Sequence, residues 1–235
     1  MGVLHIPRVI SRLREFADRE RAKVSLRFFK TAPGEYGEGD RFLGIRVPDL
    51  RRVAREFRSL SLKDVATLLA SRWHEERLLA LVILVNQYER GTDPDREAIY
   101  RLYLTSTDRI NNWDLVDASA AQIVGAHLLD RDRRVLYRLA KSRSVWERRI
   151  AIIATARFIR SGQFDDTFAI VEKLLDDEHD LIHKAAGWML REIGKRNREA
   201  EERFLRKHAV RMPRTMLRYA IERFPEALRK MYLAA

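Results

Sequence analysis

Residues 180–195 read DLIHKAAGWMLREIGK, and this stretch decides the fold class. Its apolar side chains recur at the three- and four-residue spacing of an amphipathic helix. The positions expected to face a core are Ile182, Ala185, Ala186, Met189, Leu190 and Ile193. Another face carries Lys184, Trp188, Arg191 and Lys195, spaced i, i+4, i+7 and i+11. The stretch therefore predicts a helix with one buried face and one cationic face.

Two upstream stretches resemble this helix. They are SRWHEERLLALVILV, residues 71–85, and SVWERRIAIIATA, residues 144–156. These two stretches start 73 residues apart, and the second starts 36 residues before residue 180, so the first spacing is close to twice the second. The stretch NNWDLVDASAAQIV begins near the midpoint of the longer spacing, at residue 111. Such a period indicates stacked helix pairs, in units slightly shorter than the roughly 40 to 47 residues of HEAT repeats.

Helix-breaking signals come at short intervals, and no run of strict apolar–polar alternation suggests a strand. The breaks fall at Pro48, at Ser61 with Asp64, at Gly91 through Pro94, at Ser161-Gly162, at Asp176 through Asp180 and at Met212-Pro213. We therefore expect an all-α, HEAT-like helical-repeat solenoid that forms one domain over residues 1–235. N-terminal helices would occupy about 7–30, a Gly-rich loop 31–41, and the helical repeats about 47–235.

Charge points to a nucleic-acid partner. The chain has 46 Lys and Arg against 34 Asp and Glu, a net +12, and +8 of this surplus lies after residue 180. Curved stacks of basic helices can neutralise several phosphates of duplex DNA, so we expect a basic concave face. The longest apolar run, Leu78 to Val85, is too short to span a membrane, and the absence of cysteine excludes disulfides and thiolate chemistry.

Asp117 is unusual because it lies one helical turn after Trp113, where a carboxylate would repel phosphates. One interpretation makes it the partner of an arginine in the next repeat, such as Arg148 or Arg149. The other places it where positive charge develops, as when a glycosidic bond breaks through an oxocarbenium-like transition state. Asp114 needs no such role, since a carboxylate in the first turn favourably meets the helix dipole.

Two further patterns are weak. His179 and His183 are four residues apart, but Asp180 stands where the zinc-protease pattern has glutamate, so we expect no metal site. The loop APGEYGEGD follows no predicted strand, and its acidic side chains would repel phosphate. It is interpreted as a mobile connection or a loop packed on the end of the solenoid.

Four motifs together resemble the AlkD-like alkylpurine DNA glycosylases, a HEAT-like repeat family. They are RFLGIRVPDLRR from residue 41, NNWDLVD from 111, VWERRIAI from 145 and KAAGWMLREIGK from 184. Their order and spacing agree with the family from about residue 20 to about residue 220. The resemblance implies excision of positively charged 3-methyladenine and 7-methylguanine from duplex DNA, without metal or cofactor and while the lesion remains stacked.

The resemblance also implies roles for individual residues. The catalytic aspartate falls on Asp117, and the two sugar-contacting tryptophans fall on Trp113 and Trp188. The phosphate-contacting arginine falls on Arg149, with Arg148 adjacent. Further contacts with DNA are expected from Lys184, Arg191, Lys195 and Phe28.

This chain departs from the family pattern at two places. Phe28 stands where catalytic members carry tyrosine, and residues 31–40 form a Gly-rich insertion in place of a short connection. The alternative is thus a non-catalytic HEAT-repeat protein that binds damaged, bent or branched DNA; a protein-interaction scaffold is a third class. In each case we expect an intracellular, cytoplasmic monomer without a membrane partner, associated with the nucleoid when bound to DNA.

Overall fold

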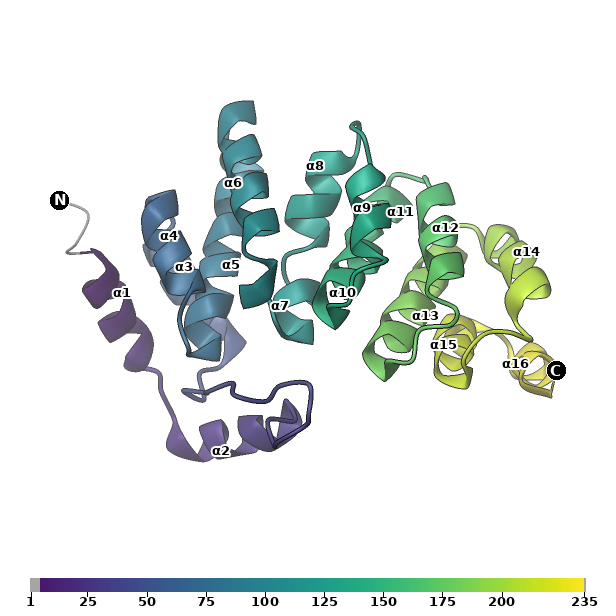
Figure 1. Ribbon diagram of the computed structural model, residues 1–235, viewed down its shortest axis with the longest axis horizontal. Coiled ribbons are helices and arrows are strands. Elements are labelled where there is room, and N and C mark those ends of the chain that lie inside the picture. The colour runs from purple at the N-terminus through teal and green to yellow at the C-terminus, as the bar shows by residue number, and fades with distance from the viewer. Residues whose placement is uncertain (1–4, 235) are drawn as a thin grey trace. The chain divides into compact units, whose positions relative to one another are not determined.

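The computed structural model describes residues 5–234, and within that range the chain forms helices and no strand (Figure 1). One isolated bridge pairs Arg41 with Trp73. The expected all-α helical-repeat fold is confirmed. None of the helices between residues 5 and 234 is both long and apolar enough to cross a membrane.

The chain divides into two compact units, residues 1–123 and 124–235. The first contains α1 (His5–Arg14), α2 (Arg19–Phe28), α3 (Val47–Glu56), α4 (Leu62–Leu69), α5 (His74–Arg90), α6 (Asp93–Thr105), the 3-10 turn Thr107–Arg109 and α7 (Trp113–Asp117). The second contains α8 (Ala126–Leu128), α9 (Arg134–Leu139), α10 (Val145–Ala154), α11 (Ala156–Arg160), α12 (Asp165–Lys173), α13 (Asp180–Gly194), α14 (Arg198–His208), α15 (Arg214–Ala220), the 3-10 turn Ile221–Arg223 and α16 (Glu226–Ala234). A π-helical turn spans Ala121–Gly125.

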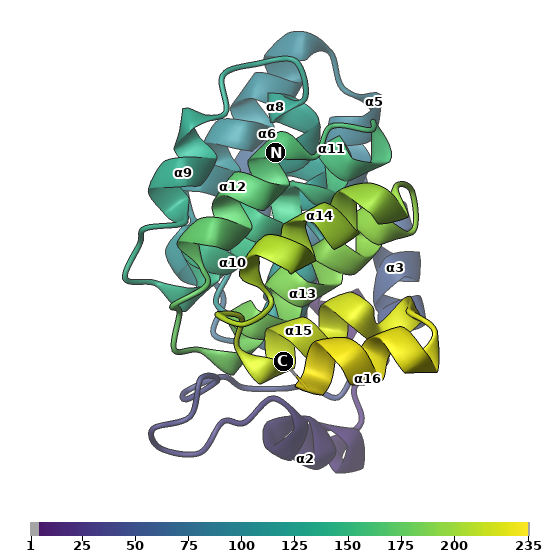
Figure 2. The same ribbon diagram turned by 90° about the vertical axis from the view of Figure 1, so that its right-hand side faces the viewer.

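Helix α5 is the core of the first unit and packs against α3, α4, α6 and α7. It is apolar on all sides between Leu78 and Leu84, which is typical of a helix surrounded by others. Helix α2 differs, because none of its residues is buried and it lies apart from α4 and α6 (Figures 1 and 2). Its Val24 and Phe28 side chains are each 62% exposed.

Helix α13 is the core of the second unit and packs against α10, α12, α14 and α15. The six positions predicted to face a core are all fully buried. Gly187 permits the close contact with α15, because a Cβ atom there would lie 2.3 Å from the Met216 carbonyl oxygen. Figure 1 shows α15 beside the lower part of α13. The glycine of the KAAGW motif is therefore a packing requirement.

The predicted helix boundaries are confirmed where they were drawn from caps and prolines. Pro48 lies in the first turn of α3, and Pro213 immediately precedes α15. Ser61 caps α4 by accepting a hydrogen bond from the Asp64 amide at 3.1 Å. Asp180 is the first residue of α13. These signals are local, which is why they could be found without the tertiary structure.

The Gly-rich loop folds back on the end of α2. The Gly37 amide donates to the Lys30 carbonyl at 3.0 Å, and a Cβ atom on Gly37 would lie 2.3 Å from the Phe29 carbonyl oxygen. The Glu38 carboxylate accepts a hydrogen bond from the Gly34 amide at 2.8 Å. These contacts hold the loop against the end of α2.

Two of the sequence motifs meet inside the first unit. The buried Glu75 carboxylate accepts backbone hydrogen bonds from Leu43 at 2.9 Å, Gly44 at 2.8 Å and Ile45 at 3.3 Å. Gly44 has a φ of 77°, and a Cβ atom there would lie 2.1 Å from the Asp18 carbonyl oxygen. The FLGI segment is thus held by one buried carboxylate at the start of α5.

Candidate functional site

Trp113 and Asp117 are the first and last residues of α7, one helical turn apart. The fully buried Asn112 caps this helix, and its Oδ1 accepts a hydrogen bond from the Trp113 amide at 2.8 Å. Both candidate side chains are half-buried. Burial raises the pKa of the Tyr103 hydroxyl, and the nearby negative charge of Asp117 raises it further. One short helix therefore presents an indole ring and a carboxylate one turn apart.

The Trp113 indole is braced by aromatic rings from the other end of the first unit. It stacks on Phe29, with ring centroids 5.4 Å apart and an angle of 22° between the planes. Phe28 meets it edge-on at 5.8 Å and 69°. Phe29 in turn stacks on Phe42 at 4.9 Å. The predicted contact residue Phe28 thus lies against Trp113, on the exposed side of this cluster.

A buried charged group lies under the indole. The His74 ring nitrogens face two carboxylates, with Nε2 2.8 Å from Asp114 Oδ2 and Nδ1 3.4 Å from Asp40 Oδ2. Asp40 also accepts from Arg77 Nη2 at 2.6 Å and from Asn112 Nδ2 at 3.1 Å. Sequence reasoning missed this group. The only signal was the run of four polar residues, His74 to Arg77, that opens an otherwise apolar helix.

The carboxylates keep the imidazole protonated. Burial alone would lower the pKa of His74, but the charge of Asp114 and hydrogen bonds to Asp114 and Asp40 raise that pKa to about 9. Burial likewise opposes ionisation of Asp40, but the hydrogen bond from His74 and the charge of Arg77 hold its pKa below the ordinary value. Asp114, expected only to interact with the helix dipole, is the main charged partner of His74.

In the second unit, the two adjacent arginines of α10 are both held by protein groups. Arg148 binds the Asp177 carboxylate through Nε at 2.6 Å and Nη2 at 3.3 Å. Arg149 is 5% exposed, and its Nη1 donates to the Leu181 carbonyl at 2.5 Å. The structure therefore gives both arginines partners within their own unit, and their contacts with phosphate stay predictions.

The predicted cationic stripe lies along α13 and its C-cap Lys195, and each of its polar groups has an acidic partner. Lys184 pairs with Asp180 at 2.6 Å and Lys195 with Glu192 at 2.5 Å. The Trp188 indole Nε1 donates to the same Glu192 carboxylate at 3.2 Å.

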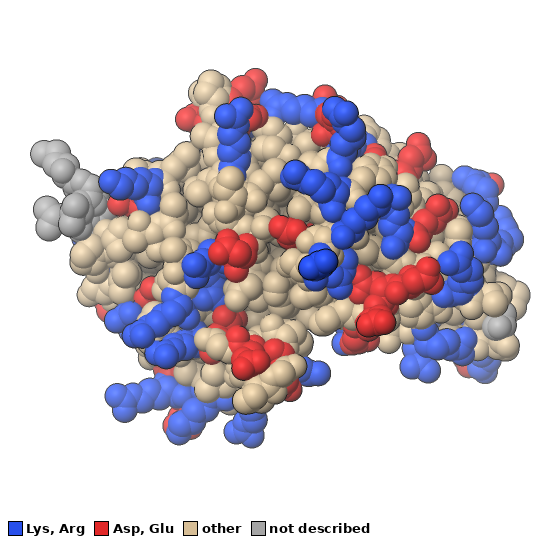
Figure 3. Space-filling model, in the orientation of Figure 1, with Lys and Arg blue, Asp and Glu red and all other residues tan. Residues whose placement is uncertain are grey.

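Arg191 pairs with Glu222 in the turn after α15. Lys and Arg side chains are interspersed with Asp and Glu over the face drawn in Figure 3. The stripe is thus a set of ion pairs, and phosphates would compete with carboxylates for it.

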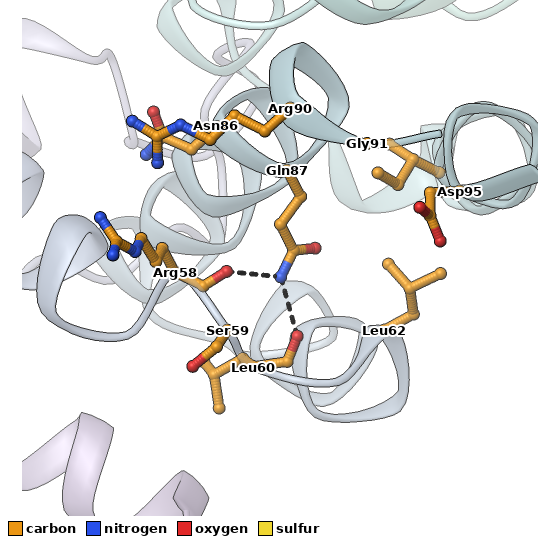
Figure 4. A pocket seen from close by; sticks show the side chains of 10 residues that line it. Arg58, Ser59, Leu60, Leu62, Asn86, Gln87, Arg90, Gly91 and Asp95 are labelled. Carbon is orange, nitrogen blue, oxygen red and sulfur yellow. Dashed lines mark hydrogen bonds between the residues drawn. The ribbon is translucent and has the colours of Figure 1, made fainter. Parts of the chain in front are cut away.

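Two other features lie apart from these residues. A cavity of about 740 Å³ opens at the far end of α5, about 20 Å along the helix axis from His74 (Figure 4). Gln87 Nε2 crosses it to donate to the Arg58 and Leu60 carbonyls, at 2.9 Å and 2.8 Å. No cluster of three or more potential metal ligands occurs among the residues that the structure describes.

The helical-repeat fold agrees with the comparisons to known proteins. Residues 9–224 match the profile of the family described as DNA alkylation repair enzymes. The chain belongs to this DNA alkylation repair enzyme family. A structure described as a predicted DNA alkylation repair enzyme from Enterococcus faecalis is similar in fold, with a TM-score of 0.68 and 17% identity, over 89% of this chain and 97% of that one. None of the curated proteins matches.

Proposed function

We propose that this protein is a monofunctional DNA glycosylase that hydrolyses the N-glycosidic bond of positively charged alkylated purines, such as 3-methyladenine and 7-methylguanine, in duplex DNA. The observation that carries the proposal is the placement of Trp113 and Asp117 one turn apart on α7. Membership in a family of DNA alkylation repair enzymes supports it.

The chemistry needs little more than a carboxylate and an electron-rich ring. An alkylated purine cation is a good leaving group: the bond between C1′ and the base nitrogen breaks, and its electron pair neutralises the purine. Positive charge then develops on the deoxyribose, where Asp117 stabilises it by charge and Trp113 through its ring face. Water adds to C1′ and loses a proton, which leaves an abasic site. No step requires a metal or cofactor.

Residues of the second unit would supply further contacts with the sugar and the phosphates of DNA. Trp188 is the second sugar-contacting ring, and its bond to Glu192 fixes the direction of its indole N–H. Arg149 is the phosphate-contacting arginine and, being 5% exposed, would exchange its bond to the Leu181 carbonyl for one to a phosphate. Lys184, Arg191 and Lys195 exchange their carboxylate partners for backbone phosphates. Because this exchange releases counterions from the DNA, binding would weaken steeply with added salt.

The deciding experiment quantifies bases released from methylated duplex DNA by the wild type and by Asp117→Asn. We expect release of 7-methylguanine and 3-methyladenine, reduced roughly 100-fold or more in Asp117→Asn. Asp108→Asn is the matched control, because Asp108 is exposed in the preceding 3-10 turn and pairs with its neighbour Arg109 at 3.1 Å. Circular dichroism and DNA binding establish that the Asp117 variant is folded.

Each other outcome excludes a part of the proposal. Equal release by the wild type and Asp117→Asn would remove Asp117 from the mechanism. Tight, salt-sensitive binding by the wild type with no release at high protein concentration would instead support the alternative, a non-catalytic HEAT-repeat protein that binds damaged, bent or branched DNA.

A further inference from the structure

The buried group under Trp113 is balanced in charge only while His74 is protonated. It contains two carboxylates, Asp40 and Asp114, and two cations, Arg77 and His74, whose side chains meet at distances of 2.6 to 3.4 Å. His74 is 2% exposed, so the ring itself is shielded from water, whereas the Asp114 side chain is 19% exposed. Loss of the His74 proton would therefore leave an uncompensated negative charge inside the protein.

The hydrogen bonds of His74 also require that its ring be protonated. An imidazolium ring has two N–H donors, one for each carboxylate, whereas a neutral imidazole has one donor and one lone pair. In the neutral form one ring nitrogen would direct its lone pair at Asp40 or at Asp114. Asp114 belongs to the first turn of α7 and Asp40 to the end of the Gly-rich loop, so one of these two segments would lose its hydrogen bond to the ring, although Asp40 would keep those from Arg77 and Asn112.

The same ring is part of the stack that holds the indole. His74 lies on Phe42, with centroids 4.6 Å apart, and against Phe29 at 4.9 Å. Phe29 is also the ring on which Trp113 stacks. Trp113 is thus linked to His74 in two ways, through the shared Phe29 ring and through its neighbour Asp114 on α7.

We propose that His74 is a positioning residue: its imidazolium, held between Asp40 and Asp114, fixes the Trp113 indole, and its deprotonation releases the indole at alkaline pH. The Gly-rich loop then has a role, since it delivers Asp40 to the imidazolium. The charged groups that face the ring are Asp40 from the loop, Asp114 from α7 and Arg77 from α5. Any effect of this deprotonation on base release rests on the proposed function. The effect on the position of the Trp113 indole does not.

The test follows both residues by NMR in the full chain without DNA. The protein is labelled with 5-fluorotryptophan and with ¹³Cε1-histidine, and the Trp113 and His74 signals are assigned with Trp113→Phe and His74→Gln. We expect both signals to titrate together with a midpoint near pH 9. Trp188, whose indole N–H bonds to Glu192 on its own helix, serves as an internal control whose signal should stay constant through this titration.

Asp114→Asn separates a charge effect from a structural one. The amide oxygen can still accept from Nε2, but the charge is gone, so both midpoints should move together by about one pH unit or more to lower pH. Asp40→Asn is the second variant should the first fail to fold, and Asp108→Asn should leave both midpoints unchanged. A Trp113 signal that stays constant while His74 titrates, in wild type and variants, would overturn the proposal.

Base release provides an independent reading. We expect wild-type release to fall through the same pH range and the fall to move to lower pH in Asp114→Asn. If the wild type releases no base at any pH while the two NMR signals titrate together, the proposed glycosylase function fails and the positioning role of His74 stands. If release falls with pH but Trp113 does not titrate, the positioning role fails and the function stands.

Discussion

Trp188 and Glu192 are joined by a hydrogen bond of 3.2 Å from the indole Nε1 to Oε1, and the same oxygen accepts from Lys195 Nζ at 2.5 Å. Burial opposes ionisation of this carboxyl, yet Lys195 and the Trp188 hydrogen bond hold the pKa of Glu192 below the ordinary value. One carboxylate therefore orients the candidate sugar-contacting ring and neutralises a candidate phosphate-binding lysine.

Removing the charge of Glu192 should strengthen DNA binding. Glu192→Gln keeps an oxygen for the Trp188 N–H but frees Lys195 and ends the 3.6 Å ion pair with Arg196. We therefore expect roughly fivefold tighter binding at 100 mM salt and a salt slope steeper by about 1 to 2. Fluorescence anisotropy of a labelled duplex over a salt series measures both. Glu199→Gln is the matched control, because it frees Arg203 on α14 from a similar ion pair of 2.6 Å. An equal gain in both variants would show that α13 has no special part in DNA binding.

The buried carboxyl of Glu201 should destabilise the protein as the pH rises. This side chain is 1% exposed, and its Oε2 fills the space where a Cβ atom on Gly194 would lie. Burial raises its pKa to about 8 from an ordinary 4.5, so its share of the folding free energy is fully present below pH 4.5 and is lost as the pH rises through 8.

Glu201→Gln retains the shape and cannot ionise. We expect it to raise the free energy of unfolding at pH 8.5 by about 1–4 kcal/mol, and to have a smaller effect at pH 5. Urea unfolding at the two pH values measures this, and the exposed Glu199→Gln should change stability by less than about 0.5 kcal/mol at either. A loss of stability in Glu201→Gln at pH 8.5 would contradict the assignment.

His74 should make stability depend on pH in a higher range. Its folded-state pKa of about 9 lies above the ordinary 6.5, so the stabilisation is fully present below pH 6.5 and is lost as the pH rises through 9. The expected loss between pH 6.5 and 10 is on the order of 3 kcal/mol in unfolding free energy. His74→Gln should flatten the urea-unfolding profile over this interval, whereas Glu201→Gln should leave that part of it in place. Parallel wild-type and His74→Gln profiles would exclude His74 as the source.

The sequence by itself determined the helices and the surfaces that they carry. A period of 3.6 residues placed the core of α13 on one face and Lys184, Trp188 and Arg191 on another, since both faces follow from spacing within one helix. The same reasoning put Asp117 one turn after Trp113. Caps and prolines, such as Ser61 and Pro213, act on adjacent backbone groups and therefore marked the boundaries of helices without further information.

Only the tertiary structure decided which charges from distant segments meet. Glu222 reaches Arg191 from the turn after α15, and Asp40 reaches His74 from a loop 34 residues earlier in the chain. No periodic pattern links such pairs, because their distances depend on how helices and loops pack and on the rotamers of long side chains. The sequence could thus predict a cationic stripe, and the pairs Lys184–Asp180 and Lys195–Glu192 also follow from spacing within one helix. The pair Arg191–Glu222 and the buried imidazolium near Trp113 depend instead on contacts between segments far apart in the chain.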